Sequence, residues 1–473
     1  MSAERLEQPA DLAVVGRLLT MNAAREIVAD GAVIIAGGDI VAVGPREPLL
    51  ARHVPRRVLG DARAIVMPGL IDAHTHCTQC FVRALVAGEL PMIPRIYNPA
   101  QRALTPAEAG ATVRLIAAQL LRSGVTTLCE GTLNRGHEDA ILEALETIGI
   151  RCVIARGMPD QEAHHAALYS QITDRSWVKA REGEAEADLA RTEELLRRYP
   201  NRGRGLIRAA VNASGLPGFS ESYFRGAAAL AEAHSTTLHV HIGRDREEVE
   251  LALAVWGRRP IERLADLGVL NERLVAIHAV LASEAEIRLL AQSGAGVAHA
   301  PIECVANLNA VPNIPQFRRA GIPVALGCDV QANDLFVTMR AAWLLHNALW
   351  GLPRYDPEAL SATELLAMAT CESARVLHCD DRIGSLEPNK AADITVLDGA
   401  APHLMAMQDL EIELVRFASR AEVKHVLVDG RPLLENGAPT TIDLERLYAE
   451  AEAGARHVRD TVSGRRYRPL NSE

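Results

Sequence analysis

The segment Pro68-Gly-Leu-Ile-Asp-Ala-His-Thr-His76 constrains the fold more than any other part of the chain. It is an apolar run that ends in two histidines, His74 and His76, with one residue between them. Side chains alternate between the two faces of a strand, so both imidazoles point to the same side if this segment is a strand. Two imidazoles that face one space can begin a metal site, although such pairs also occur by chance at a surface.

Four later segments repeat this layout, because each is a short apolar run with a polar residue near its C-terminal end. The segments are 237–243, 274–280, 296–301 and 323–330, and their polar residues are His239, His241, His278, His299 and Asp329. Further strand candidates lie at 125–130, 151–156 and 205–214, and apolar helical segments such as 138–148 and 221–233 separate them. Eight strands that alternate with helices predict an α/β fold, a (β/α)8 TIM barrel over residues 68–380 with its functional side chains at the C-terminal strand ends.

Short β-branched runs separated by turns lie on both sides of the predicted barrel. Residues 1–67 and 381–440 each hold too few strands to fold alone, so we expect them to pair into one composite β-sandwich. Residues 441–473 are expected to form an amphipathic C-terminal helix and a tail, which dock on the body or take part in an oligomer contact. The charged stretch 160–198 is either an insertion over the site or a solvated helix pair, and we favour the helix pair.

Charge and hydropathy exclude several kinds of partner. The net charge of -10 argues against binding to nucleic acid or to a membrane surface. No apolar run reaches the roughly 18 residues that a membrane span needs, and residues 1–7 lack the basic start and apolar core of a signal peptide. We therefore expect a cytoplasmic protein whose partner is a small molecule.

Taken in order along the chain, these motifs resemble the amidohydrolase superfamily. The segment with His74 and His76, the single histidines of later strands, the Gly-Cys-Asp329 triplet and the late run Gly384-Ser-Leu-Glu-Pro-Asn-Lys-Ala-Ala-Asp-Ile all stand in the family's order. The likeness covers nearly the whole chain. It is strongest to the branch of s-triazine hydrolases and aromatic-base deaminases, whose offshoots include phenylurea hydrolases and molinate hydrolase. The resemblance implies a metal-dependent hydrolase of carbon–nitrogen bonds other than peptide bonds, and a homo-oligomer.

The resemblance also implies a ligand set. It makes His74, His76, His241 and Asp329 the metal ligands. Two-metal relatives bridge their ions with a carboxylated lysine on the fourth strand, and segment 205–214 contains no lysine, so we expect one divalent metal ion per chain. Three imidazoles and one carboxylate suit zinc best, with iron and cobalt as alternatives.

Two catalytic residues follow from the same resemblance. A bound metal lowers the pKa of its water to roughly 7, and Asp329 is placed to take the proton and later to protonate the leaving group. His278 would hold the developing negative charge or relay the proton. His239 is expected outside the ligand set, and His299 either lines the pocket or only packs.

One departure from the branch bears on the substrate. Ring deaminases and triazine hydrolases have a glutamate three residues after the strand-five histidine, which protonates a ring nitrogen, whereas this chain has Arg244. A guanidinium stays charged at pH 7 and cannot donate and retake that proton. Relatives also have Ser-Asn after the strand-seven histidine, where this chain has Glu303-Cys304.

A carbonyl flanked by heteroatoms needs no ring protonation, and Arg244 could help to polarise it. We therefore expect cleavage of a C–N or C–S bond in a small urea, carbamate or thiocarbamate such as a phenylurea. The alternatives are a deaminase or dechlorinase of an s-triazine, purine or pterin ring, and a catalytically inactive structural homologue. Arg244 could instead pair with Asp245, Glu247 or Glu248 at the rim.

The remaining pocket candidates are chosen by their position near predicted strand ends. They are Phe81, Arg156, Asn212, Arg244, His299, Cys304 and Asn333. An aromatic content of 4% favours recognition of an apolar group by aliphatic side chains, helped by a few aromatics such as Trp177.

Overall fold

The computed structural model describes residues 8–86, 92–133, 136–160, 184–213, 218–308 and 310–463. Trp177 and most of the charged stretch 160–198 lie outside the described residues, and the end of that stretch forms helix α6 (Ala185–Arg198). Within the described residues, none of the helices combines the length and the apolar character that crossing a membrane requires.

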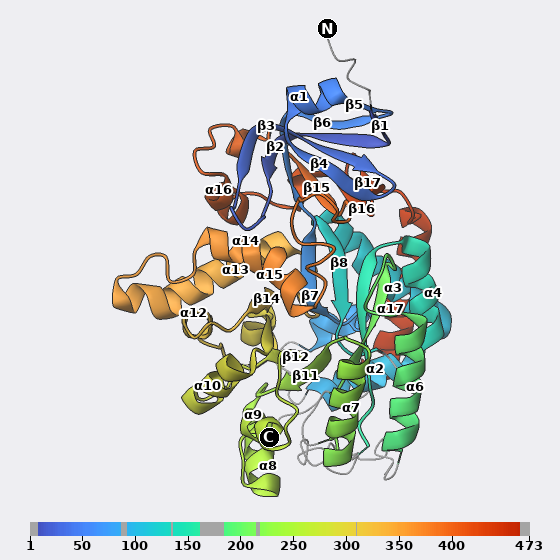
Figure 1. Ribbon diagram of the computed structural model, residues 1–473. Coiled ribbons are helices and arrows are strands. Elements are labelled where there is room, and N and C mark those ends of the chain that lie inside the picture. The colour runs from blue at the N-terminus through green and yellow to red at the C-terminus, as the bar shows by residue number, and fades with distance from the viewer. Residues whose placement is uncertain are drawn as a thin grey trace, which may run out of the picture.

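Eight parallel strands follow one another in chain order and form the centre of the molecule (Figure 1). They are β7 (Leu70–Thr75), β8 (Val125–Glu130), β9 (Arg151–Arg156), β10 (Ile207–Asn212), β11 (Leu238–Ile242), β12 (Leu274–His278), β13 (Gly296–His299) and β14 (Val324–Leu326). The barrel closes between its first and last strands, where the Asp329 N–H donates to the carbonyl of His74 at 2.8 Å. The side chain of Thr75 donates to the carbonyl of Asp329 at 3.0 Å. The predicted (β/α)8 barrel is confirmed.

Helices cover the outside of the strands, and their starts follow local sequence signals. Helix α3 (Pro106–Arg122) begins with Thr105 as N-cap, a proline at its first position and a reciprocal bond between Thr105 and Glu108. The other helices of the outer layer are α4 (Glu138–Ile148), α7 (Glu221–Ala233), α8 (Arg246–Trp256), α9 (Pro260–Asp266), α10 (Glu284–Ser293), α12 (Ile314–Arg319), α13 (Leu335–His346), α14 (Ala362–Met368) and α15 (Cys371–Val376). The predicted helices at 138–148 and 221–233 have the bounds of α4 and α7.

Strands from both chain ends form one further sheet beside the barrel, in which N-terminal and C-terminal strands are neighbours (Figure 1). Its order is β18 (Ala438–Pro439), β17 (Arg431–Glu435), β16 (Val423–Val428), β15 (Ile394–Asp398), β6 (Val58–Pro68), β2 (Leu12–Leu19), β3 (Ile27–Ala36) and β4 (Asp39–Pro45). Alternate residues of β2 pack into two different apolar clusters, Val14 into one and Ala13 with Val15 into the other. Strands β1 (Gln8–Ala10) and β5 (His53–Pro55) make a small separate sheet.

A buried ion pair joins this sheet to the barrel. The Arg151 guanidinium at the start of β9 binds both carboxylate oxygens of Asp393, with Nε to Oδ2 at 2.7 Å and Nη2 to Oδ1 at 3.0 Å. Both side chains are buried. Asp393 directly precedes β15, so the pair fixes the C-terminal strands against the base of the barrel.

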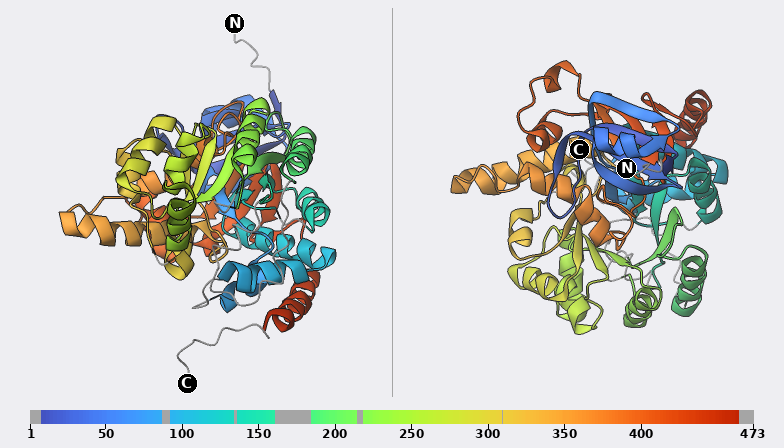
Figure 2. Two further views of the ribbon diagram at one scale, coloured as in Figure 1. Left: turned by 90° about the horizontal axis from the view of Figure 1, so that it is seen from below. Right: turned by 45° about the horizontal axis from the view of Figure 1, so that its top comes forward.

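The C-terminal helix α17 (Leu444–Ser463) docks on the barrel's outer layer beside α3, as both figures show (Figures 1 and 2). Arg114 of α3 donates to Glu450 at 2.7 Å, and His457 Nδ1 lies 2.9 Å from a carboxylate oxygen of Glu108. The predicted C-terminal helix is therefore present, and it packs on its own chain.

Candidate metal centre

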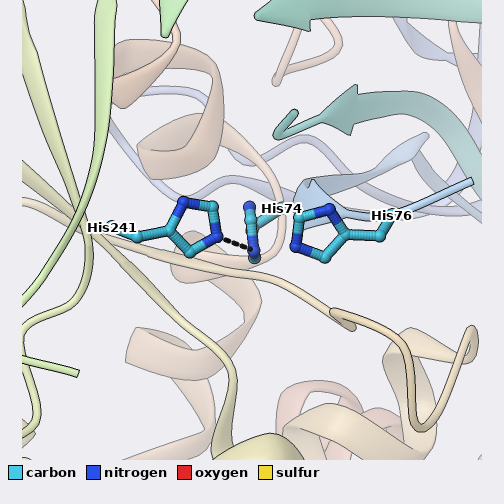
Figure 3. A group of neighbouring side chains, drawn as sticks. All are labelled: His74, His76 and His241. Atoms are coloured by element: carbon cyan, nitrogen blue, oxygen red, sulfur yellow. Dashed lines mark hydrogen bonds between the residues drawn. The ribbon is translucent and has the colours of Figure 1, made fainter. Parts of the chain in front are cut away.

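Three imidazoles converge at the C-terminal ends of the barrel strands (Figure 3). His74 projects from β7 and His76 directly follows the end of that strand, while His241 projects from β11. Residues two apart in an extended segment share a face. The Nε2 atoms of His74 and His241 are 3.2 Å apart, and the three side chains offer nitrogens within 4.8 Å of one another. Ligands around a tetrahedral zinc with bonds of about 2.0–2.1 Å lie about 3.3 Å apart, so this spacing fits a metal ion.

A carboxylate and a fourth imidazole complete the cluster. Asp329 Oδ2 lies 3.4 Å from His74 Nε2 and 3.6 Å from His278 Nε2, and Asp329 Oδ1 lies 3.8 Å from His76 Nε2. The chain turns sharply at two of these residues, because His278 has φ 72° and Asp329 has φ 52°. Residues other than glycine rarely adopt this left-handed conformation, and it is concentrated at functional sites.

Two glycines leave room for the ring of His74. A β-carbon at Gly131 would lie 2.3 Å from Cε1 and 2.4 Å from Nδ1 of that ring. A β-carbon at Gly327 would lie 2.8 Å from the β-carbon of His74. Any side chain at either position would displace His74, so both glycines are needed for the observed position of its ring.

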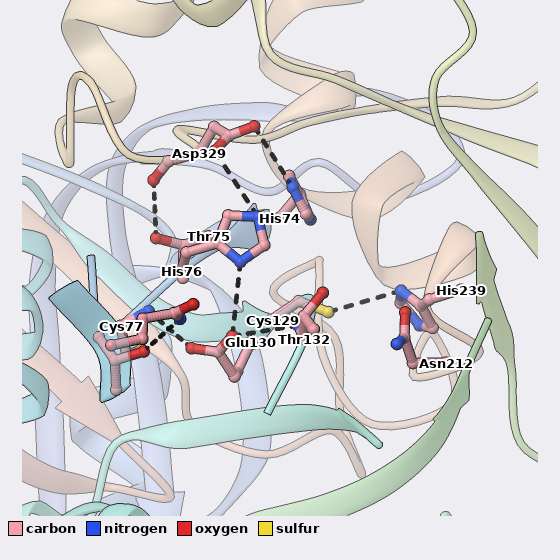
Figure 4. A network of polar contacts seen from close by, with 12 residues as sticks. His74, Thr75, His76, Cys77, Cys129, Glu130, Thr132, Asn212, His239 and Asp329 are labelled. Atoms are coloured by element: carbon pink, nitrogen blue, oxygen red, sulfur yellow. Dashed lines mark hydrogen bonds and ion pairs between the residues drawn. The ribbon is translucent and has the colours of Figure 1, made fainter. Parts of the chain in front are cut away.

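Two buried carboxyls hold the first strand and the loops around it, and sequence reasoning had given neither a role. Asp72 Oδ1 accepts N–H bonds from His74 and Cys328 at 3.3 and 2.9 Å. Glu130 accepts N–H bonds from Cys77 and Thr132, and its Oε1 lies 3.7 Å from His76 Nδ1 (Figure 4). Carboxylates behind metal-binding imidazoles fix the ring orientation. The sequence signal that could have identified these two residues is an acidic side chain inside an apolar strand, for Asp72, or at its end, for Glu130.

The electrostatics of the cluster favour a cation. Burial lowers the pKa of His74, and burial lowers that of His278 to about 3, so both rings are neutral at pH 7. Burial also holds the pKa of His241 well below its ordinary value.

The pKa values of His76 and Asp329 depend on the charged groups beside them. Burial opposes charge on His76, but Glu130 and Asp329 raise its pKa above the ordinary value. Burial likewise opposes charge on Asp329, but the nearby imidazoles lower its pKa and keep it ionised. The neutral rings of His74, His241 and His278 beside the ionised Asp329 suit a divalent metal, because metal ligands must be deprotonated.

Arg244 lies near this cluster but pairs with its neighbour. Its Nε donates to Asp245 Oδ2 at 2.7 Å, Nη2 contacts the same oxygen, and its backbone N–H donates to Glu248 at 2.8 Å. Its positive charge also acts to lower the pKa of His278. The pairing with Asp245 is the alternative considered for Arg244 from the sequence.

Three pocket candidates make ion pairs or apolar contacts with other parts of the chain. The Arg156 guanidinium contacts Glu138 at 3.1 Å and Asp188 at 2.9 Å, on helices α4 and α6 outside the barrel. The ring of Phe81 packs against Gly454 of α17, and Cys304 is buried in an apolar cluster. Arg156 points away from the barrel interior because successive side chains of a strand alternate between its two faces, and the last residue can face either way.

Three other polar side chains, His299, His239 and Asn212, have hydrogen-bond partners within the protein. His299 Nε2 lies 2.8 Å from Nε2 of His346, which stacks on Trp350, so His299 takes part in packing between β13 and α13. His239 lies outside the ligand set, as expected, with Nε2 2.8 Å from Thr237 Oγ1 and its pKa lowered by burial to about 3. The Asn212 amide donates to the Gly157 carbonyl at 3.4 Å.

Asn333 remains a pocket candidate on geometric grounds. Its side chain is fully buried, and both amide atoms lack a hydrogen-bond partner within the part of the chain that the structure describes. It stands four residues after Asp329, and the backbone there has a φ of 47°. A buried amide without a partner is costly unless a ligand or water satisfies it.

Comparisons with known proteins agree with this architecture. The model of the amidohydrolase family matches residues 65–433. A protein of Nitratidesulfovibrio vulgaris named 5-methylthioadenosine/S-adenosylhomocysteine deaminase is 32% identical over 466 residues, 97% of this chain and 100% of the relative.

Two solved structures are similar to this chain over nearly its whole length. The crystal structure of an adenosine deaminase from Xanthomonas campestris with bound zinc has a TM-score of 0.83 and 27% identity, over 96% of this chain and 100% of that one. The crystal structure of atrazine chlorohydrolase from Arthrobacter aurescens TC1, complexed with zinc, has a TM-score of 0.81 and 25% identity, over 94% and 100% of the two chains. The likeness therefore spans the barrel together with the sheet of the chain ends.

Proposed function

This chain belongs to the amidohydrolase family, and we propose that it is a zinc-dependent deaminase that removes an amino group from a nitrogen heterocycle by hydrolysis. The observation that carries the proposal is the full-length similarity, at 32% identity, to a relative named as a deaminase of 5-methylthioadenosine and S-adenosylhomocysteine. An aminated purine, free or as a nucleoside, is therefore the first candidate substrate. An s-triazine or pterin ring is the second.

This proposal reverses the order of the two substrate classes drawn from the sequence. The urea and carbamate hypothesis relied on Arg244 to polarise a carbonyl. The guanidinium instead binds the carboxylate of Asp245, which offsets its charge and holds it at the rim. A relative named as a urea or carbamate hydrolase is not among the similar proteins described above, so the similarity favours ring deamination.

The metal would be held by His74, His76, His241 and Asp329. When bound, such an ion lowers the pKa of a water molecule to roughly 7 and so supplies a nucleophile at neutral pH. Asp329, buried and ionised, is the base that accepts the first proton of that water. His278, neutral and 3.6 Å from Asp329, can donate a hydrogen bond to the oxygen that becomes negative during attack.

The reaction needs one further proton transfer. Water adds to the carbon that carries the amino group while a ring nitrogen takes a proton, which gives a tetrahedral carbon with one hydroxyl and one amino group. Asp329 then passes its proton to the amino group, ammonia leaves, and a ring carbonyl remains. The hydroxyl proton is released in the last step, so one water and one aminated ring give one ammonia and one oxo ring.

The test is ammonia release by the purified enzyme from a panel of defined compounds. The panel contains aminopurines and their nucleosides, aminopterins, amino- and chloro-s-triazines, N-aryl ureas and thiocarbamates, and Asp329→Asn serves as the inactive control. We expect ammonia from at least one aminated ring and none from the Asp329→Asn protein. Release of an amine from the ureas or thiocarbamates, with no reaction of the rings, would overturn the proposal.

A further inference from the structure

Ring deamination requires a proton donor for the ring nitrogen, and no residue has been assigned to that step. The inference that follows rests on the proposed function. A ring nitrogen must be protonated as water attacks, and the first charged residue after β11 is Arg244. A guanidinium cannot give up and regain a proton near pH 7. Another acid must therefore face the substrate.

Glu303 has the geometry of such an acid. It follows β13 directly, at the same end of the barrel as the metal ligands, in the short helix α11 (Pro301–Glu303). Only 3% of its surface is exposed. The Asn307 amide donates to Oε1 at 2.6 Å, whereas Oε2 is buried and has no hydrogen-bond partner among the described residues. One oxygen is thus anchored and the other is available to a ligand.

The charges around Glu303 are those of the metal cluster. Asp329, His76 and Arg244 all act on its carboxyl, and Glu303 in turn acts on His76 and on the buried hydroxyl of Tyr97. Burial raises the pKa of Glu303, and the negative charge of Asp329 raises it further. The next residue, Cys304, packs in one apolar cluster with Val330, which directly follows Asp329, so the carboxyl of Glu303 lies close to the metal cluster.

Two other buried glutamates, Glu130 and Glu248, lie near the site and accept backbone hydrogen bonds. Glu130 uses both oxygens to accept backbone N–H bonds from Cys77 and Thr132. Glu248 Oε2 accepts the Arg244 N–H at 2.8 Å, and its Oε1 is also buried without a partner among the described residues. Glu248 lies on α8, however, and the charges that act on its carboxyl are those of Asp245 and Arg244. Neither of these two carboxyls combines an available oxygen with the charges of Asp329 and His76.

We propose that Glu303 donates a proton from Oε2 to the ring nitrogen of the substrate. As the water oxygen bonds to the amino-bearing carbon, the π pair of the adjacent C=N bond moves to the ring nitrogen and takes the Glu303 proton. When ammonia leaves with the proton that Asp329 accepted, the hydroxyl proton of the tetrahedral carbon returns to the Glu303 carboxylate. The acid is then restored, and no other reactant is needed.

The experiment compares Glu303→Gln with Glu248→Gln, two substitutions of buried glutamates that each keep a hydrogen-bond acceptor. The substrate is whichever heterocycle the wild-type protein deaminates. General acid–base catalysis is worth about 10²–10⁴-fold, so Glu303→Gln should lower kcat by that factor while Glu248→Gln stays within about threefold of wild type. Both variants should retain the wild-type metal content and the wild-type circular dichroism spectrum.

Binding gives a second readout that does not depend on turnover. Calorimetry would compare a tetrahedral hydroxyl analogue that carries an N–H in the ring with an analogue of the substrate in which carbon replaces that ring nitrogen. Glu303→Gln should weaken binding of the tetrahedral analogue by about 100-fold and leave the carbon analogue unchanged. If the glutamine variant does not fold, Glu303→Asp carries the same comparison, with a smaller loss for the tetrahedral analogue alone.

The outcomes separate this inference from the proposed function. A wild-type protein that deaminates rings while Glu303→Gln keeps more than half of its kcat would overturn the role of Glu303 only. Loss of metal from Glu303→Gln would also overturn it, because the residue would then be a ligand. A wild-type protein that releases no ammonia from any ring would instead refute the proposed function.

Discussion

Replacement of Gly131 by alanine tests whether the position of the His74 ring controls metal binding. The new β-carbon would lie 2.3 Å from Cε1 and 2.4 Å from Nδ1 of His74. Ordinary contacts begin at about 3.4 Å, so the ring must withdraw by about 1 Å, which is several times the tolerance of about 0.2 Å for a metal bond. Gly131 has no positive φ, so the clash is the only expected cost.

The expected result is a weaker metal site in a folded protein. Disturbing the support of a metal ligand typically costs 10- to 100-fold in affinity, which is about 1.4–2.7 kcal/mol, and a shift of about 1 Å belongs at the upper end of that range. Zinc affinity is measured by competition with a chromogenic chelator, and folding is checked by circular dichroism.

Gly136→Ala is the matched control for this prediction. Gly136 lies five residues further along the chain, and a β-carbon there would meet no atom within 4 Å. This variant should bind zinc as the wild type does. Wild-type zinc affinity in Gly131→Ala would refute the reasoning, because the ring of His74 would then tolerate displacement or would not be a ligand.

Three further predictions concern the site, its pH dependence and the link between the two sheets. His241→Ala should lose the metal and all activity, whereas His278→Ala should keep the metal and lose most of kcat; loss of metal from His278→Ala, seen by elemental analysis, would make His278 a ligand. Burial raises the pKa of Glu248 to about 8, whereas the same carboxyl in an unfolded chain has a pKa near 4.5. The protonated Glu248 therefore makes its full contribution to folding stability below pH 4.5, and this contribution declines as pH rises towards 8. Glu248→Gln should therefore gain stability relative to wild type between pH 5.5 and pH 8, by up to ~1.4 kcal/mol per pH unit in urea unfolding, and parallel pH profiles would contradict this. Asp393→Ala leaves the Arg151 guanidinium buried without its main partner and should lower the free energy of unfolding by about 3–5 kcal/mol; a change below ~1 kcal/mol would mean that the pair adds little.

The barrel could be predicted from the sequence because its signals are local. Apolar runs with a polar residue near the end, and helix starts such as the capping box at Thr105, depend on neighbouring residues alone. The spacing of His74 and His76 in one strand sets their common direction in the same way. These features give the fold and a convergent histidine cluster without knowledge of distant contacts.

The sequence does not predict as well which way a side chain points at the end of a strand. In a parallel barrel both faces of a strand are buried, so hydrophobicity does not reveal which residues face inward. Arg156 was placed in the pocket from its position, yet its partners Glu138 and Asp188 lie on the outer helices. Nothing in the local sequence of β9 indicates that these helices supply two carboxylates.

Contacts between distant segments decide the rest of the site. The effect of Gly131 on His74, the pairing of His299 with His346 and the approach of Glu303 to Asp329 each join residues that are far apart in the chain. Arg244 and Glu303 are separated by 58 residues in the sequence, so only the fold shows that both lie at the same end of the barrel.

The measurement that tests the account most directly is metal analysis of the purified protein combined with ammonia release before and after chelation. We predict about one zinc per chain, loss of ring deamination when the metal is removed, recovery when zinc is restored, and no retained metal in His241→Ala. Ammonia release at the wild-type rate from a protein free of metal would contradict the central claim that His74, His76, His241 and Asp329 hold the ion on which the reaction depends.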